Sequence, residues 1–235
     1  MKNEKMMFQK RDCPLKIELV PQGAGWTHVY LITGGERLFF VISNVLGHQF
    51  STLVRALYFF SPKQNDPDNA DDIIESKVGA YDMESGEVTE IFEAGSHPVP
   101  GVYKDIPHRA EFIWDEEGSY SRWLLEREPN DNHDFAVKIH IEIQRGEDHK
   151  EHNFEFLYKD LCYAVAKAYT TAMKDYGFCG YHFSTYHENI NVNHLLYLKS
   201  VALDYHKIRK LINHPSGHGE ATKFEDELKL LLFDM

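Results

Sequence analysis

The chain has 235 residues, of which 43% are hydrophobic and 26% are charged, with 37 acidic residues against 25 basic ones. A chain of this length can bury enough apolar surface to fold without a structural metal or a disulfide framework. Its formal charge of −12 argues against proteins that bind nucleic acid through cationic contacts to phosphates. We therefore expect no nucleic-acid partner.

No stretch of the sequence has the pattern of a secretory signal or of a membrane-spanning helix. The apolar run Met6–Phe8 is shorter than the roughly 7 to 15 residues of a signal peptide, and residues 228–233 fall short of the roughly 20 that cross a bilayer. The three cysteines, Cys13, Cys162 and Cys179, are an odd number without Cys-x-x-Cys spacing, which is typical of a reducing compartment. We expect a cytoplasmic protein with no membrane partner.

Residues 1–62 predict a first module of three strands followed by a helix. Residues 15–20 alternate in hydrophobicity, and residues 26–43 contain two runs rich in Val, Ile, Tyr and Phe around Gly34-Gly35. Paired glycines between two such runs are typical of a β-hairpin. Apolar residues then recur at helical spacing from about residue 48 to residue 60, before Pro62.

Residues 63–76 predict an acidic connection, and residues 77–235 a larger module that begins with strands. Hairpins are expected at residues 77–93 and 110–128, and a long alternating strand at residues 134–145. The two modules can form one continuous domain.

Three helices are expected after these strands. The first runs from Asn153, as the N-cap, to Gly177, and the second from Val192 to Asn213. Residues 222–233 predict a short terminal helix that docks back onto the fold.

These elements predict an α+β fold, with antiparallel sheets built from hairpins and long helices packed on one face. The order β-β-β-α occurs twice, by duplication or by coincidence.

The acidic residues are concentrated in the middle of the chain. Residues 65–155 hold 24 acidic and 8 basic residues, whereas the rest of the chain is mildly basic. A field of one sign accelerates the encounter with an oppositely charged partner. The functional interpretation is a docking surface for a basic protein, and the simpler one is that the exposed faces of the hairpins are acidic.

The hairpin at residues 110–128 contains the candidate binding residues of this surface. They are Trp114, Asp115, Glu116, Glu117 and Tyr120. Aromatic rings rimmed by carboxylates can anchor Arg or Lys side chains of a partner. The same rings can instead form cross-strand pairs within the sheet, which is the interpretation favoured for Trp114.

The fourteen histidines form the alternative candidate site. His182, Ser184 and His187 combine titratable and hydroxyl groups in one segment, and His140 adds a second histidine position on the polar face of its strand. His149 and His152 are expected in a solvated polar loop. Neither the His-Glu-x-x-His pattern nor a phosphate-binding glycine loop occurs, so we predict no metal site and no cofactor.

The sequence favours a non-catalytic, acidic protein-binding module that docks a basic protein, as an inhibitor or an immunity-type protein would. One alternative is a metal- or histidine-dependent hydrolase. The other is a homo-oligomeric structural protein, because the terminal helix has an apolar face to cover.

Overall fold

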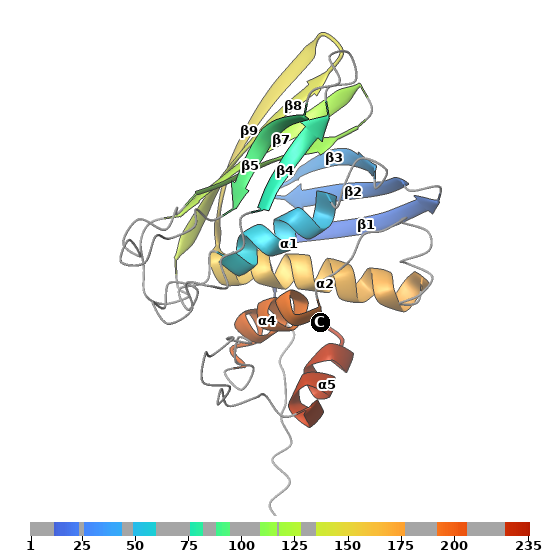
Figure 1. Ribbon diagram of the computed structural model, residues 1–235. Coiled ribbons are helices and arrows are strands. Elements are labelled where there is room, and N and C mark those ends of the chain that lie inside the picture. Colours follow the sequence, from blue (N-terminus) through green and yellow to red (C-terminus); the bar gives the residue numbers. More distant parts are fainter. Residues whose placement is uncertain are drawn as a thin grey trace, which may run out of the picture.

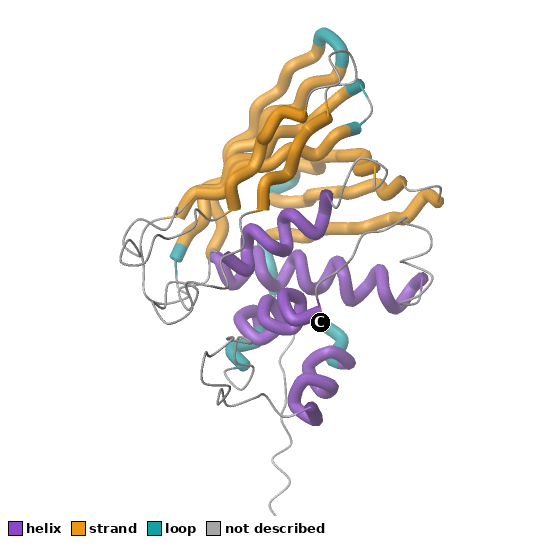
Figure 2. Tube along the Cα trace, in the orientation of Figure 1, coloured by secondary structure: helices purple, strands orange, loops and turns teal. Residues whose placement is uncertain are grey.

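The protein folds into antiparallel sheets packed against helices, as a computed structural model of the chain shows. The α+β prediction is thereby confirmed. Strands and helices are segregated into two layers, with the strands above the helices in the view of Figure 2. The structure describes residues 12–23, 26–43, 49–59, 76–81, 88–94, 109–116, 118–127, 135–176, 192–205 and 224–235.

The first sheet has three strands, β1 (Leu15–Gly23), β2 (Trp26–Thr33) and β3 (Glu36–Ser43), in that order. The predicted hairpin between β2 and β3 is confirmed, with Thr33 opposite Glu36. Its two turn residues, Gly34 and Gly35, have φ angles of +54° and +89°. Residues other than glycine rarely adopt these backbone angles. The two glycines therefore fix both the turn and the register of the hairpin.

Helix α1 (Gln49–Phe59) follows this sheet, close to the predicted bounds. One face of the helix is buried, and this face carries Phe50, Leu53, Val54 and Leu57. The helix packs against β3, β6 and two later helices, so it contacts both strand-bearing modules.

The remaining strands form a hairpin and a four-stranded sheet. The hairpin pairs β4 (Ser76–Tyr81) with β5 (Val88–Ala94). The four-stranded sheet contains, in order, β6 (Arg109–Asp115), β7 (Ser119–Arg127), β8 (Ala136–Arg145) and β9 (Asp148–Leu157). Strand β8 alternates as predicted, because Val137, Ile139, Ile141 and Ile143 are all buried.

The prediction that Asn153 begins the long helix is wrong. Strand β9 runs through Asn153, and helix α2 (Tyr158–Tyr176) begins only after Leu157. The helical spacing of Phe154, Leu157 and Leu161 bridges the junction between strand and helix by chance. Because β9 pairs with β8 throughout its length, His149 and His152 also lie in a strand and not in a loop.

Two shorter helices complete the described fold. Helix α4 (Val192–Ala202) ends well before the predicted Asn213, in a turn where Asp204 has a φ of +51°. Residues 206–213 lie outside the described residues. The terminal helix α5 (Phe224–Leu232) docks on α4 as predicted, and Leu230 is buried against Leu196 and Tyr205.

A single main core connects the two larger sheets with α1, α2 and α4. In Figure 1, α1 and α2 lie directly beneath the strands, and α4 and α5 lie below them. The centre of this core is aromatic. The Trp114 ring is fully buried, with its centroid 4.4 Å from that of Trp123 and 5.4 Å from that of Phe40. Among the described helices, none is both long and apolar enough to cross a membrane.

A buried lysine holds the C-terminal helix in place. Lys199 of α4 has no exposed surface, and its Nζ donates hydrogen bonds to the carbonyl oxygens of Leu231, at 3.1 Å, and Phe233, at 2.9 Å. Carbonyls at a helix C-terminus lack partners within the helix, so this ammonium group satisfies two of them. Burial lowers the pKa of Lys199 to about 8, although the nearby Asp234 carboxylate favours the charged form.

Replacement of Trp114 by Ala is expected to lower the free energy of unfolding by about 3–5 kcal/mol, because it leaves a cavity at the junction of the two larger sheets. Tyr120→Ala, in the next strand, removes a ring that is 40% exposed, and should cost less than about 1 kcal/mol. Urea unfolding of the two variants measures this difference. Equal losses would contradict the placement of the two rings.

Lys199 should make the free energy of unfolding depend on pH in the alkaline range. Because its pKa is about 8 in the fold and about 10.4 in an unfolded chain, the unfolded state binds more protons between these values. The free energy of unfolding should therefore rise with pH in this window, by at most about 1.4 kcal/mol per unit. Urea unfolding at pH 8 and pH 10 tests this, with Lys199→Met as the reference. The free energy of unfolding of the wild type, minus that of the variant, should be larger at pH 10 than at pH 8. A difference that does not grow with pH would refute the prediction.

Candidate functional site

Two tight turns lie side by side at one end of the four-stranded sheet. The β6–β7 turn passes through Gly118, with a φ of +95°, and the β8–β9 turn through Gly146, with a φ of +59°. The turns are adjacent because Ser119 of β7 pairs with Arg145 of β8. We call this surface the hairpin end, and define it as residues 116, 118–120 and 144–151. Hydrogen-bonded strands position residues 119–120, 144–145 and 148–151 of this surface.

The hairpin end includes some of the predicted binding residues and excludes others. Tyr120 is exposed on it, but the Trp114 ring lies in the core and is not available to a partner. The side chains of Asp115 and Glu117 lie outside those that the structure describes. Only Tyr120 and Glu116 of the predicted set are therefore placed here.

Glu116 faces an arginine of its own chain. Its carboxylate accepts hydrogen bonds from Arg145 Nε and Nη2, at 3.2 and 3.4 Å, and its side chain is only 5% exposed. The same Nη2 donates a hydrogen bond to the carbonyl oxygen of Phe39, and the guanidinium lies 5.6 Å from the Phe39 ring centroid. Arg145 thus connects the hairpin end to strand β3, and Glu116 serves to orient it.

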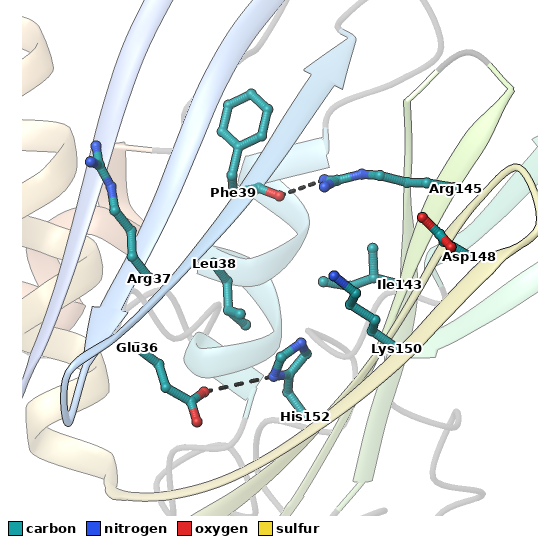
Figure 3. A pocket seen from close by; sticks show the side chains of 9 residues that line it. All are labelled: Glu36, Arg37, Leu38, Phe39, Ile143, Arg145, Asp148, Lys150 and His152. Carbon is teal, nitrogen blue, oxygen red and sulfur yellow. Dashed lines mark hydrogen bonds and ion pairs between the residues drawn. The ribbon is translucent and has the colours of Figure 1, made fainter.

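A groove of about 450 Å³ lies between β3 and the β8–β9 hairpin. Figure 3 shows that two bridges cross it, one from Arg145 to the Phe39 carbonyl and one from His152 to Glu36. The second bridge joins His152 Nδ1 to Glu36 Oε2 over 3.7 Å. The remaining lining residues are Arg37, Leu38, Ile143, Asp148 and Lys150. The volume lies within the usual range for ligand sites, about 300–1,000 Å³.

Both signs of charge line this groove. Arg145 is paired with Glu116, and Arg37 lies 3.8 Å from Glu18 on the outer face of the first sheet. Asp148 and Lys150 form no ion pair with any other described side chain. They are two residues apart on β9 and therefore lie on the same face of the strand. The groove thus offers one acidic and one basic group to a ligand.

The outer face of the four-stranded sheet carries a polar network around His140, the third histidine of the predicted site. The Nδ1 atom of His140 lies 2.8 Å from Asn153 Oδ1, and its Nε2 lies 3.4 Å from a carboxylate oxygen of Glu142. The Asn153 hydrogen bond and the Glu142 carboxylate raise the pKa of His140. His140 is thereby held more often in its charged form, next to Arg122, which is 3.6 Å from Glu142.

The predicted histidine site cannot be assembled from the described part of the chain. His182, Ser184 and His187 lie outside the described residues. Within the described ranges, no three His, Cys, Asp or Glu side chains are close enough together to hold a metal ion.

An aromatic cluster on the outer face of the first sheet was not anticipated from the sequence. The His28 and Tyr30 rings each lie beside Phe39, with centroid distances of 5.0 and 5.2 Å. The Arg37 guanidinium lies 4.1 Å from the Tyr30 ring centroid, within the range of a cation–π contact. The alternation of residues along β2 and β3 could have indicated this cluster. Residues 28, 30, 37 and 39 alternate with the buried residues and therefore lie on the other face of the sheet.

Groove residues from β3 and from the β8–β9 hairpin were also missed. Phe39 and Arg145 are 106 positions apart in the sequence, and no local pattern links them.

Comparison of the chain with models of known protein families, with curated proteins and with solved structures found no match in any of the three.

Proposed function

We propose that this protein is a non-catalytic binding protein whose hairpin end docks a basic protein partner, in the manner of an inhibitor or an immunity-type protein. The observation that carries the proposal is the charge of residues 65–155, with 24 acidic and 8 basic residues in a chain whose remainder is mildly basic. Such a field raises the encounter rate with a cationic partner, and this effect weakens with ionic strength.

The described side chains of the hairpin end support this proposal. Glu147, Asp148 and Glu151 are exposed there, and so are the cations Arg145 and Lys150. Arg145 adds little positive charge to the surface, because Glu116 neutralises it. The excess of negative charge at the hairpin end therefore belongs to side chains that face solvent.

An exposed aromatic ring accompanies these carboxylates. Tyr120 is 40% exposed, and it lies on a strand that is paired on both sides. A ring held on a rigid strand loses little conformational entropy when a partner covers it. A tyrosine beside carboxylates suits the aliphatic and charged parts of an Arg or Lys side chain.

Charge reversal at the hairpin end tests the proposal. The double variant Glu147→Lys/Glu151→Lys should bind basic partners at least about tenfold more weakly at low salt, a loss of about 1.4 kcal/mol. Its matched control is Asp175→Lys/Glu225→Lys, which makes the same change of net charge at exposed positions on helices α2 and α5. Immobilised wild type and both variants are incubated with cell extract, and the retained proteins are identified and titrated as pure proteins.

The location of the charge, and not its sum, should determine the result. Wild type and the control variant are expected to retain the same basic protein, with an affinity that falls as salt rises, and the hairpin-end variant to lose it. If both variants lose the partner equally, net charge alone explains the binding. If neither loses it, the hairpin end is not the docking surface.

A further inference from the structure

Strand β3 has one edge that no described strand covers. Within the described residues, β3 pairs only with β2, on its other side. Glu36 and Thr33 flank the two-residue turn and form a hydrogen-bonded pair, and such pairs alternate along an antiparallel ladder. Phe39, opposite Tyr30, therefore occupies a non-hydrogen-bonded position. Its N–H and C=O groups point away from β2, as do those of Arg37.

The hydrogen bond from Arg145 independently shows that the Phe39 carbonyl points away from β2. Arg145 belongs to β8, on the far side of the groove, and its Nη2 reaches the Phe39 carbonyl oxygen. The main-chain groups of Arg37 and Phe39 that point away from β2 consequently face the groove of about 450 Å³. An uncovered strand edge is a template for another extended chain, because it presents donors and acceptors at the spacing of a strand.

We propose that the groove binds a short extended polypeptide segment of a partner, which adds to β3 as a further strand. Its main chain would hydrogen-bond with Arg37 and Phe39, and its inward side chains would face Asp148 and Lys150, which lie on the same face of the β8–β9 hairpin as Ile143. At about 3.3 Å per residue, only a few residues fit into the groove. The inference does not depend on the acidity of the hairpin end, and it can be correct where the proposed docking of a basic protein is not.

The two unpaired charges in the groove define the side chains of this segment. Asp148 and Lys150 are two residues apart on one face of β9, and positions i and i+2 of an extended peptide have the same spacing. A segment with a basic and an acidic residue at i and i+2 therefore matches the groove. A uniformly acidic or uniformly basic segment would leave one of the two charges opposed by a like charge.

Binding requires only a local rearrangement in the protein. The Phe39 carbonyl would exchange its donor, Arg145 Nη2, for a main-chain N–H of the incoming strand. Arg145 would remain held by Glu116, which accepts from both Nε and Nη2. The uncovered carbonyl is thus satisfied by Arg145 in the free protein and by the peptide in the complex.

Synthetic peptides of the sequence Thr-Val-Lys-Val-Glu-Val-Thr test the inference. Their binding to the full chain is measured by isothermal titration calorimetry. In a strand, the N–H groups of the Lys and Glu residues point to one edge, and those of the Val residues to the other. N-methylation of one of these sets should weaken binding at least about tenfold, and methylation of the other set by less than about threefold. Equal losses for the two sets, or no binding of the parent peptide at 1 mM, would overturn the inference.

A charge exchange in the protein supplies the second arm. The variant Asp148→Lys/Lys150→Glu leaves the net charge unchanged, so it alters the groove without altering overall electrostatic attraction. It should bind the parent peptide about tenfold more weakly, and should regain affinity for a peptide in which Lys and Glu are exchanged. The control Asp175→Lys/Glu225→Lys should bind both peptides as the wild type does. An exchange variant that keeps the wild-type preference would also overturn the inference, whatever the hairpin-end variants show.

Discussion

The position of the groove depends on one aromatic contact between the two larger sheets. Phe40 of β3 lies against Trp114 and Trp123, with ring centroids 5.4 and 5.2 Å away. Because side chains alternate along a strand, burial of Phe40 turns its neighbour Phe39 to the opposite face. The same contact brings the end of β3 opposite the β8–β9 hairpin. The groove and its two bridges follow from this position.

Arg145 determines the charge of the surface where the two sheets meet. It neutralises Glu116, a member of the acidic segment, and it covers a carbonyl of β3 from a strand more than a hundred residues away. In the described part of residues 65–155, seven acidic side chains accompany five basic ones. The acidity of the segment is thus partly balanced within the fold, and local pairing determines where negative charge remains available to a partner.

Most of the strands and helices could be predicted from the sequence. The prediction failed at the junction of β9 and α2, where the two-residue period of a strand gives way to the 3.6-residue period of a helix. The glycines of the β2–β3 turn and the alternation of β8 are local signals, and both elements formed as expected. Strand β9 was missed, because its polar residues gave no alternation of hydrophobicity and Phe154 fits the spacing of the following helix. The groove was not predictable in this way, since it depends on how the sheets pack. Trp114 illustrates the same limit, because its local pattern could not distinguish a core position from a surface position.

The interactions proposed for the hairpin end and for the groove act over different distances, so the two proposals are compatible with one binding event. Charge acts across about 8–10 Å of solvent at physiological ionic strength, so it governs how fast a partner arrives. Main-chain hydrogen bonds act only at contact, so an uncovered strand edge governs how long an extended segment stays. Arg145 lies between the two surfaces and bonds to both Glu116 and the Phe39 carbonyl. Arg145 is therefore the side chain that connects the two proposed surfaces.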